Sequence, residues 1–417
     1  MTLIPRRARA RLLEDLSFFR SVLLQGARQV GKSTLATAIA AELGARVVTL
    51  DDIDVRDLAR SDPGLLLDSL GRPAVIDEVQ RGGDGLVLAL KARLDTTREK
   101  GQFLLTGSSG FLTTPGLSES LAGRMGVVEL WPLSVGERLG GHDGLVGRLL
   151  DGPDGLLSHG SATVPRDDYL ELLCTGGMPE VQELSARGRG VWFDAYLETV
   201  LRREIESAAD LRKVDALERM ARLLLASTGD EMVAASLAQR LGIDRATAST
   251  YEPWLESAFL VHRVAAWGRN LGAAAVKRPK LHAVDTGLAA ASLGKDLDAL
   301  RRPTEPATGR LLESFVVAEL AKQVSWAERP IRLHHLRETG GIEIDAVLQT
   351  TDGRVCAVEV KASTRARPED ARHLATVRDR LDRVGGEFVV GVVLHTGEQR
   401  LPLGDRIVAL PIADLWT

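Results

Sequence analysis

The 417-residue chain contains only two cysteines, Cys174 and Cys356. Both lie in apolar or strand-like surroundings, so a disulfide framework and zinc-ligand spacing are not expected, and a reducing cytoplasm is the expected compartment. No apolar run approaches the roughly 20 residues that span a bilayer. The formal net charge of −4 excludes a uniformly basic nucleic-acid coat, although a local basic face remains compatible with it.

The composition is that of a globular protein, with 44% hydrophobic and 26% charged residues. A chain of this length is expected to form about three domains, each able to bury its own core. The arginines between positions 6 and 11 are not expected to form a targeting signal, because acidic residues and a glycine-rich segment follow almost at once.

That segment, residues 21–34, fits Gly-x-x-x-x-Gly-Lys-Ser/Thr at every fixed position, between an apolar run and a helical pattern. Backbone N–H groups of such a loop surround phosphate oxygens, and the following helix start adds partial positive charge. A chance Gly-rich turn before a helix explains this context less well. We predict that Lys32 reaches the β/γ-phosphates and that the Ser33 hydroxyl binds Mg²⁺, with Thr34 behind it. The segment expected to line the nucleotide comprises Gly26, Ala27, Arg28, Gln29, Val30, Gly31, Lys32, Ser33 and Thr34.

Two later strand-like segments end in carboxylates, 46–52 and 73–78. The second is the better partner for the loop, because acids at the carboxyl end of a buried strand lie where open α/β sheets bind ligands. Asp77 would hold the magnesium, directly or through water, and Glu78 would orient and polarise the attacking water. The alternative is a solvated acidic turn, which is less favoured downstream of a complete phosphate loop.

A further strand, 102–109, ends in hydroxyls at the corresponding level, and Thr106 and Ser108 are expected to contact the γ-phosphate or the water. Arg124 is the candidate cation for the charge that develops on the transferred phosphoryl group, from its own or from a neighbouring subunit. The alternative is a surface arginine in a loop.

These motifs together resemble a large family of prokaryotic predicted ATPases that are similar to AAA+ and archaeal-type ATPases. The resemblance rests on Gly-x-Arg28-Gln29-x-Gly-Lys-Ser, Ile-Asp77-Glu78-Val-Gln80, Leu-Thr106-Gly-Ser108, Leu-Ala-Gly123-Arg124 and Glu129-Leu-Trp-Pro132-Leu-Ser134. It covers nearly the whole chain and implies an α/β fold with a P-loop AAA+-like ATPase core, a helical lid, a winged helix and a restriction-endonuclease-like end.

The pattern after residue 136 supports several modules. Residues 137–166 are rich in Gly, Asp and Pro without a sustained period, which indicates a linker, and helical spacing resumes at 169–174 and 192–201. The expected domains are an ATPase core at 1–136, a linker at 137–166, a helical lid at 167–214, a winged helix at 215–272 and a nuclease-like domain at 273–417.

The segment 233–251 has the layout of a helix-turn-helix, with a turn at Gly242 and a second helix capped by Asp244. Residues 255–264 are expected to run from a recognition helix into a wing strand, and Pro253 is expected to bend the helix. Over 235–282, seven Lys/Arg minus three Asp/Glu give +4, which favours contact with a phosphate backbone and makes DNA the expected partner. The alternative is a winged helix used for packing or assembly.

The C-terminal part carries a second constellation. Strands at 342–348 and 355–361 place Glu359 and Lys361 on one face, Asp345 can meet them across the hairpin, and Glu313 can join from the helical segment 309–320. This arrangement resembles the core of the PD-(D/E)xK nucleases. The resemblance implies that Asp345 and Glu359 bind Mg²⁺ or Mn²⁺ and that Lys361 orients or helps to deprotonate water. The alternative is an edge hairpin with alternating charges.

We therefore expect a Mg²⁺-dependent ATP-binding and ATP-hydrolysing protein that associates with DNA, whose nuclease-like domain cleaves phosphodiesters under nucleotide control. One alternative is a nucleotide-dependent switch or assembly protein whose later domains only bind DNA or protein. Another is a DNA-binding regulator that uses ATP without turnover. A homo-oligomer is expected if Arg124 acts between subunits. The expected catalytic residues are Glu78, Arg124, Glu313, Asp345, Glu359 and Lys361.

Overall fold

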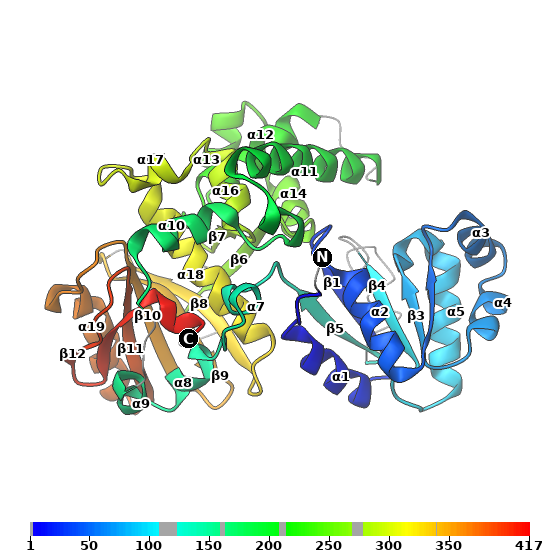
Figure 1. Cartoon of the computed structure of the whole chain (residues 1–417), viewed down its shortest axis with the longest axis horizontal. Coiled ribbons are helices and arrows are strands. Elements are labelled where there is room, and N and C mark those ends of the chain that lie inside the picture. Colours follow the sequence, from blue (N-terminus) through cyan, green and yellow to red (C-terminus); the bar gives the residue numbers. More distant parts are fainter. Residues whose placement is uncertain (1–2, 108–122, 159–162, 208–213, 269–277, 339) are drawn as a thin grey trace. The chain divides into compact units, whose positions relative to one another are not determined.

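The computed structural model describes residues 3–107, 123–158, 163–207, 214–268, 278–338 and 340–417. The chain forms two compact units, which are described separately (Figure 1). The first comprises Met1–Leu133 with Ser257–Phe259, and the second comprises Ser134–Glu256 with Leu260–Thr417.

The first unit is built on a parallel five-stranded sheet in the order β2-β3-β4-β1-β5. Its strands are β1 (Ser21–Gly26), β2 (Arg46–Thr49), β3 (Ala74–Asp77), β4 (Phe103–Gly107) and β5 (Met125–Leu130). Its helices are α1 (Ala8–Phe18), α2 (Lys32–Leu43), α3 (Ile53–Ser61), α4 (Pro63–Leu70) and α5 (Gly83–Thr96), with a 3-10 turn η1 at Val79–Gly82.

Both faces of this sheet are buried, which explains the continuous apolar run before the phosphate loop. Val22 and Leu24 of β1 pack in one core with residues of α1 and α2. Leu23 points to the other face and packs in a second core with residues of α4 and α5. The carboxyl ends of β1, β3 and β4 therefore meet at one edge of a sheet that is covered on both sides.

The second unit contains a mixed eight-stranded sheet in the order β12-β13-β11-β10-β9-β8-β6-β7. The strands are β6 (Val261–Ala266), β7 (Lys280–Ala283), β8 (Ile331–Arg337), β9 (Glu343–Thr350), β10 (Val355–Lys361), β11 (Phe388–His395), β12 (Leu401–Gly404) and β13 (Ile407–Pro411). Helix α19 (Arg372–Asp382) packs on this sheet through Leu374 and Val377. The largely buried helix α18 (Ala307–Ser325) contacts β7, β8, β9 and β10.

The remaining helices of the second unit precede or interrupt this sheet. They are α7 (Val135–Leu139), α8 (Leu145–Leu150), α9 (Pro153–Ser158), α10 (Arg166–Thr175), α11 (Ala186–Ser207), α12 (Val214–Ala226), α13 (Ala234–Leu241), α14 (Arg245–Ser257), α16 (Thr286–Ser292) and α17 (Leu297–Arg301), with 3-10 turns η2 (Pro179–Glu183), η3 (Pro368–Ala371) and η4 (Ile412–Leu415).

Two features differ from the sequence-based expectations. Helices α7, α8 and α9 occupy much of the expected linker 137–166; each has five or six residues, too few to produce a visible hydrophobic period. Helix α14 contains Pro253 and continues to Ser257, and the bend expected at this proline stays a prediction. Strand β6 pairs with β8, so the large sheet includes strands on both sides of the expected boundary at residue 273.

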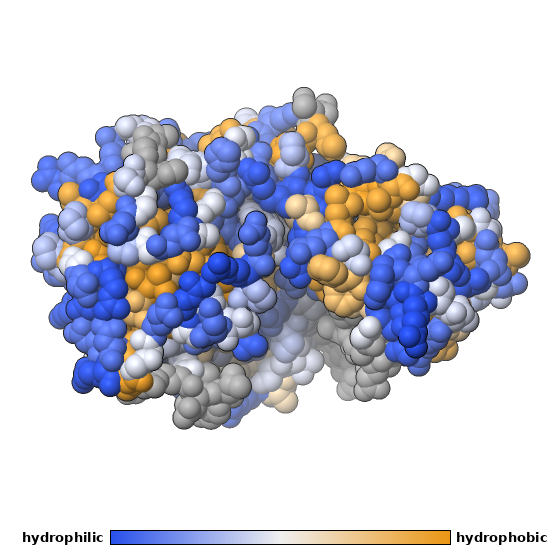
Figure 2. Space-filling view, turned by 90° about the horizontal axis from the view of Figure 1, so that it is seen from below, coloured by the Kyte–Doolittle hydropathy of each residue, from blue (hydrophilic) through white to orange (hydrophobic). Residues whose placement is uncertain are grey.

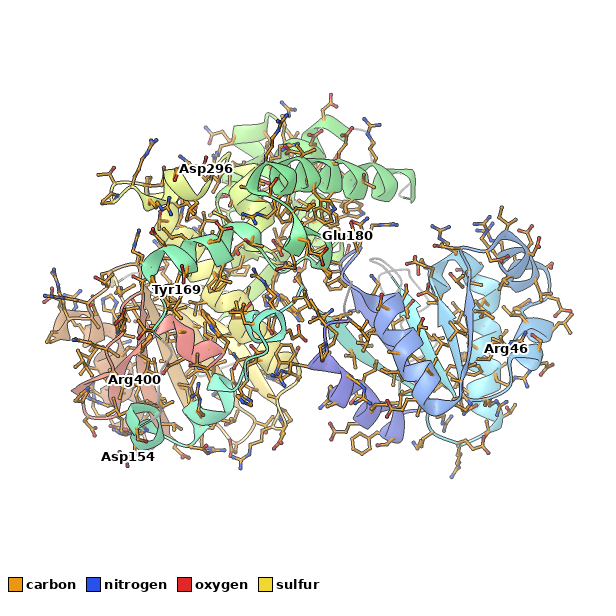
Figure 3. The ribbon with its side chains drawn as sticks, viewed as in Figure 1. Arg46, Asp154, Tyr169, Glu180, Asp296 and Arg400 are labelled. Carbon is orange, nitrogen blue, oxygen red and sulfur yellow. The ribbon has the colours of Figure 1, made fainter. Side chains whose placement is uncertain are left out.

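The C-terminal segment is anchored within the second unit by contacts of Tyr169 and Arg400, which are labelled in Figure 3. The Tyr169 ring of α10 lies edge-on to Trp416 at 5.9 Å between centroids, and its hydroxyl accepts a hydrogen bond from Ala413 N at 3.1 Å. Arg400 donates two hydrogen bonds to the carboxylate of Asp414, at 3.1 and 2.6 Å. The contacts of Tyr169 fix the chain end to a helix far away in the sequence.

On the face drawn in Figure 2, patches of hydrophobic residues lie among hydrophilic ones. Within the described residues, no helix combines the length and the apolar character needed to cross a membrane.

Candidate nucleotide site and carboxylate cluster

The glycine-rich loop connects β1 to α2, and two of its glycines are required by geometry. A Cβ added to Gly26 would lie 2.3 Å from the carbonyl oxygen of Leu130, so a side chain there would collide with the neighbouring strand. Gly31, which precedes α2, has φ 98°, a backbone conformation that other residues rarely adopt. The loop is therefore shaped by backbone constraints as well as by its charged residue.

Lys32 is 6% exposed and its ammonium group is held by the loop itself. Its Nζ donates to the carbonyl oxygens of Gly26 at 2.9 Å and Ala27 at 2.8 Å. Burial lowers the pKa of Lys32 to about 8, although the charges of Glu78 and Asp77 act in the opposite direction. The site thus holds a partly desolvated cation at the start of a helix, which suits an anionic ligand.

The Asp77 carboxylate gathers hydroxyl groups from three other segments. Its Oδ1 accepts from Ser33 Oγ at 2.8 Å and from Thr106 Oγ1, and its Oδ2 accepts from Thr49 Oγ1 at 3.3 Å. Thr106 Oγ1 also accepts from the backbone N–H of Glu78 at 3.1 Å. The structure thus brings the predicted residues Ser33, Asp77, Glu78 and Thr106 together at the carboxyl ends of β3 and β4.

Glu78 has φ 56° and leaves the strand in the left-handed conformation, with its Oε2 accepting from Gln80 Nε2 at 2.6 Å. Sequence reasoning gave no role to Gln80, Thr49 or Arg6. The Arg6 guanidinium donates to the carbonyl of Val30 in the loop at 2.8 Å and to that of Trp131. Its position in a run of arginines before the loop is the signal in the sequence for this contact.

The chemistry of this donor set fits a hard divalent cation. The Ser33 hydroxyl and the Asp77 carboxylate are already in contact, and both are the oxygen ligands that Mg²⁺ prefers. These two residues would hold the metal, and the charge it supplies when bound would offset that of the nucleotide phosphates. Lys32 would add a further positive charge beside the phosphates.

Arg124 does not reach this site within its own chain. It precedes β5 and donates to both carboxylate oxygens of Asp95, at 2.5 and 3.2 Å. Its carbonyl accepts from the N–H of Ser21 at the start of β1, whereas the phosphate loop follows the end of that six-residue strand. At about 3.3 Å per residue the two ends are roughly 16 Å apart. Ser108, the other predicted contact, lies outside the described residues.

Strands β9 and β10 bring the predicted nuclease-like residues together. Asp345 and Glu359 lie one residue beyond the antiparallel pair Ala346–Val358. The Oδ2 of Asp345 accepts from the N–H of Val360 at 2.8 Å, and the Oε1 of Glu359 accepts from Lys361 Nζ at 2.7 Å. The hairpin thus places two carboxylates and one ammonium side by side, as its alternation predicts.

A second lysine, which sequence reasoning counted only as part of a basic surplus, joins these acids to Glu313. Lys280 of β7 is 1% exposed, and its Nζ lies 2.8 Å from Glu313 Oε1, 2.9 Å from Glu343 Oε1 and 3.8 Å from Asp345 Oδ1. We refer to Glu313, Glu343, Asp345 and Glu359 as the carboxylate cluster. Among the described residues, no three acidic, histidine or cysteine side chains are arranged, as placed, to hold a metal ion, so this site does not fit a metal without rearrangement.

Burial dominates the electrostatics of the carboxylate cluster. Burial and the charge of Asp345 raise the pKa of Glu313 to about 8 and that of Glu359 to about 8. Burial also raises the pKa of Asp345. Burial opposes the charged form of Lys280 too, but the charges of Glu313 and Asp345 outweigh it and raise the pKa of this lysine. The buried carboxylates of the cluster therefore depend on Lys280 for compensation of their negative charge.

Ion pairs neutralise part of the excess positive charge of residues 235–282. Arg263 pairs with Glu252 and, at 3.2 Å, with Glu256, and Lys280 is buried. Arg240, Arg245 and Arg278 are exposed. Arg240 lies in the last turn of α13 and Arg245 is the first residue of α14, so these two cations flank the turn of the helix-turn-helix segment.

Comparison with known proteins agrees with the loop geometry. Residues 19–139 match the AAA domain family, residues 166–299 match a domain of unknown function (DUF8612) and residues 308–415 match another (DUF4143). Two uncharacterised mycobacterial proteins, Rv2008c of Mycobacterium tuberculosis and Mb2031c of Mycobacterium bovis, are each 30% identical over 418 residues, which covers 100% of this chain and 85% of theirs.

Two solved structures show a weaker likeness. The Walker-type ATPase PABY2304 of Pyrococcus abyssi is 16% identical, with 70% of this chain and 96% of that chain covered and a TM-score of 0.42. The RuvB Holliday junction branch migration motor of Thermotoga maritima is 22% identical, with 61% and 89% covered and a TM-score of 0.29.

The phosphate loop, the Asp77 carboxylate at the end of β3 and the AAA domain match define a nucleotide-binding P-loop ATPase with an α/β core. The chain belongs to the family of Rv2008c and Mb2031c. In this chain, the AAA domain match is followed by matches to two domains of unknown function.

Proposed function

We propose that this protein hydrolyses ATP with Mg²⁺ and that Glu78 orients and polarises the attacking water. The observation that carries the proposal is the 2.8 Å contact between Ser33 Oγ and Asp77 Oδ1, which joins the phosphate loop to the acidic end of β3. Lys32 binds the β/γ-phosphates, and Ser33 and Asp77 hold the metal. Thr106 positions both Asp77 and the backbone of Glu78 through its single hydroxyl.

The test separates binding from turnover. Glu78→Gln should retain ATP affinity while lowering hydrolysis by about 10²-fold or more, because a positioned base contributes this much. Lys32→Ala should abolish binding. Glu99→Gln, an exposed carboxylate of the same unit, is the matched control and should hydrolyse ATP normally. Normal turnover by Glu78→Gln would remove Glu78 from this role, and unchanged ATP affinity of Lys32→Ala would refute the phosphate-loop assignment.

We propose further that the helix-turn-helix segment belongs to a winged helix that contacts a DNA backbone. The exposed Arg240 and Arg245, on either side of its turn, support this assignment. Replacing both with alanine should weaken DNA binding and lower the salt slope by about one for each phosphate that is no longer neutralised. Replacing Arg187 and Arg219, which are exposed on α11 and α12, is the matched control. Equal losses of affinity in both double variants would argue against a site at the turn.

A second candidate activity is metal-dependent phosphodiester cleavage under nucleotide control. The grouping of Asp345, Glu359 and Lys361 on one hairpin favours it. The alternative, a domain that only binds DNA or a protein partner within a nucleotide-dependent switch, is favoured by Lys280, which fills the carboxylate cluster. Single-stranded, double-stranded and branched DNA incubated with Mg²⁺ or Mn²⁺, with and without ATP, distinguishes them. Cleavage that Asp345→Asn abolishes supports the nuclease, and intact DNA throughout supports the binding role.

A further inference from the structure

The carboxylate cluster already contains a cation, and that cation is a side chain of the protein. The Nζ of Lys280 lies within 3.8 Å of oxygens from Glu313, Glu343 and Asp345. These three residues come from α18 and β9, whereas Lys280 comes from β7 at the edge of the sheet. An ammonium group with three donors can satisfy several carboxylates at once, so Lys280 occupies a position in which a bound metal ion would otherwise compensate these charges.

The cluster is nevertheless not fully satisfied. Glu359 is 7% exposed, and within the described part of the chain its buried Oε2 has no hydrogen-bond partner, although its Oε1 is bound by Lys361. A buried carboxylate oxygen without a partner costs free energy. The neighbouring Asp345 is close enough to raise the pKa of Glu359. An additional cation beside Asp345 and Glu359 would relieve both the unpaired oxygen and the repulsion.

The lysine and the carboxylates fall within different sequence-family matches but within one compact unit of the structure. Lys280 falls within the DUF8612 match at 166–299, whereas Glu313, Glu343, Asp345 and Glu359 fall within the DUF4143 match at 308–415. Strand β7 is held by β6 and by the segment that precedes the helix-turn-helix, through Gly229 N to Leu281 O at 2.8 Å and Met232 N to Pro279 O at 2.9 Å. Strand β7 also contacts α18 directly, and His282 Nδ1 lies 3.0 Å from Ser314 Oγ, so the packing of one compact unit holds Lys280 beside Glu313.

We propose that Lys280 and a divalent cation are alternative occupants of the carboxylate cluster, and that Lys280 occupies it in the arrangement seen here. The lysine blocks metal binding by repulsion and by filling the space between Glu313, Glu343 and Asp345. Loss of the Lys280 ammonium group opens the cluster to Mg²⁺ or Mn²⁺. This inference rests on the proposed nuclease-like function only for the choice of Asp345 and Glu359 as ligands, and it does not require that the metal-bound site cleaves DNA.

The test uses the full chain without nucleotide and Mn²⁺ alone, with free Mn²⁺ measured by electron paramagnetic resonance. Lys280→Met should bind one Mn²⁺ at least about tenfold more tightly than the parent, because a unit charge at the site no longer opposes the dication. Adding Asp345→Asn to Lys280→Met should remove the gain. Any Mn²⁺ bound at the phosphate loop is common to all variants and cancels in the comparison.

Lys322→Met is the matched control. Lys322 is also buried, lies on the same helix as Glu313 and binds Glu319 at 2.6 Å. Its removal should leave Mn²⁺ binding unchanged. Lys280→Met could fail to fold because the carboxylates around residue 280 would lose their counter-charge. In that case the double variant with Glu313→Gln removes one charge of each sign, keeps Asp345 and Glu359, and is tested in its place.

Equal Mn²⁺ affinity in the parent and in folded variants that lack Lys280 would overturn the proposal, as would an equal gain in Lys322→Met. A gain that depends on both Lys280 and Asp345 would support it. If the variant binds Mn²⁺ tightly but leaves DNA intact, the proposed cleavage fails while the exchange between lysine and metal stands.

Discussion

Replacing Lys32 with methionine should remove nucleotide binding without unfolding the nucleotide-free protein. Lys32 is desolvated in the folded state, and burial lowers its pKa from 10.5 to about 8. Methionine fills a similar volume and carries no charge, so it avoids this desolvation. The variant does lose the hydrogen bonds to the carbonyls of Gly26 and Ala27, each worth about 1 kcal/mol or somewhat more from a charged donor.

The pKa difference, 10.5 minus about 8, corresponds to about 3 kcal/mol. Because the folded-state pKa is lowered, the unfolded chain binds more protons between pH 8 and 10.5, and the stability of the parent must rise through that window. At pH 7 the free-energy cost of burying the charged Lys32 side chain is fully present. It roughly offsets the free energy that the two hydrogen bonds contribute, so the parent and Lys32→Met should be nearly equally stable. By pH 10.5 the parent should be more stable than the variant by about 3 kcal/mol.

Scanning calorimetry of both proteins from pH 7 to 10.5 measures this difference, because groups that titrate alike in both proteins cancel. A hundredfold excess of Mg-ATP over its dissociation constant should add about 2.7 kcal/mol to the parent at pH 7 and nothing to the variant. A stability difference that does not change with pH would refute the desolvated state of Lys32. Stabilisation of the variant by Mg-ATP would refute its role in binding.

Three further predictions concern other contacts. Arg124→Ala should change the free energy of unfolding by less than about 1 kcal/mol, because Asp95 and Arg124 are partly exposed. It should lower ATP turnover if Arg124 acts on the nucleotide site of a neighbouring copy. Mixing this variant with Glu78→Gln should then restore turnover, and no recovery would argue against action between subunits. Thr106→Val should lower turnover by about tenfold or more with little loss of ATP affinity, and a change confined to affinity would contradict its positioning role. Asp414→Asn should destabilise the second unit by about 3 kcal/mol in denaturant unfolding, because Arg400 would lose a buried counter-charge; an unchanged midpoint would contradict this.

The phosphate loop, the acids after β3 and the strands of the C-terminal hairpin were predictable from local patterns. A loop that cradles phosphate needs glycines and a lysine at fixed spacing, so its motif is contiguous in the sequence. The placement of the Asp345 and Glu359 side chains beside each other also follows from the period of two along paired strands. The short helices α7 to α9 were not predictable, because five or six residues leave no period to detect.

Sequence alone thus determined which residue types could bind a nucleotide and which acids could share one face of a hairpin, because both depend on spacing along a single segment. Only the tertiary structure decided what lies beside them. The approach of Arg6 to the loop, the distance of Arg124 from it and the burial of Lys280 among carboxylates all join segments far apart in the chain. Such contacts depend on how strands and helices pack, so a lysine that contributes to a basic surplus in the sequence becomes, in the fold, the counter-ion of an acidic cluster.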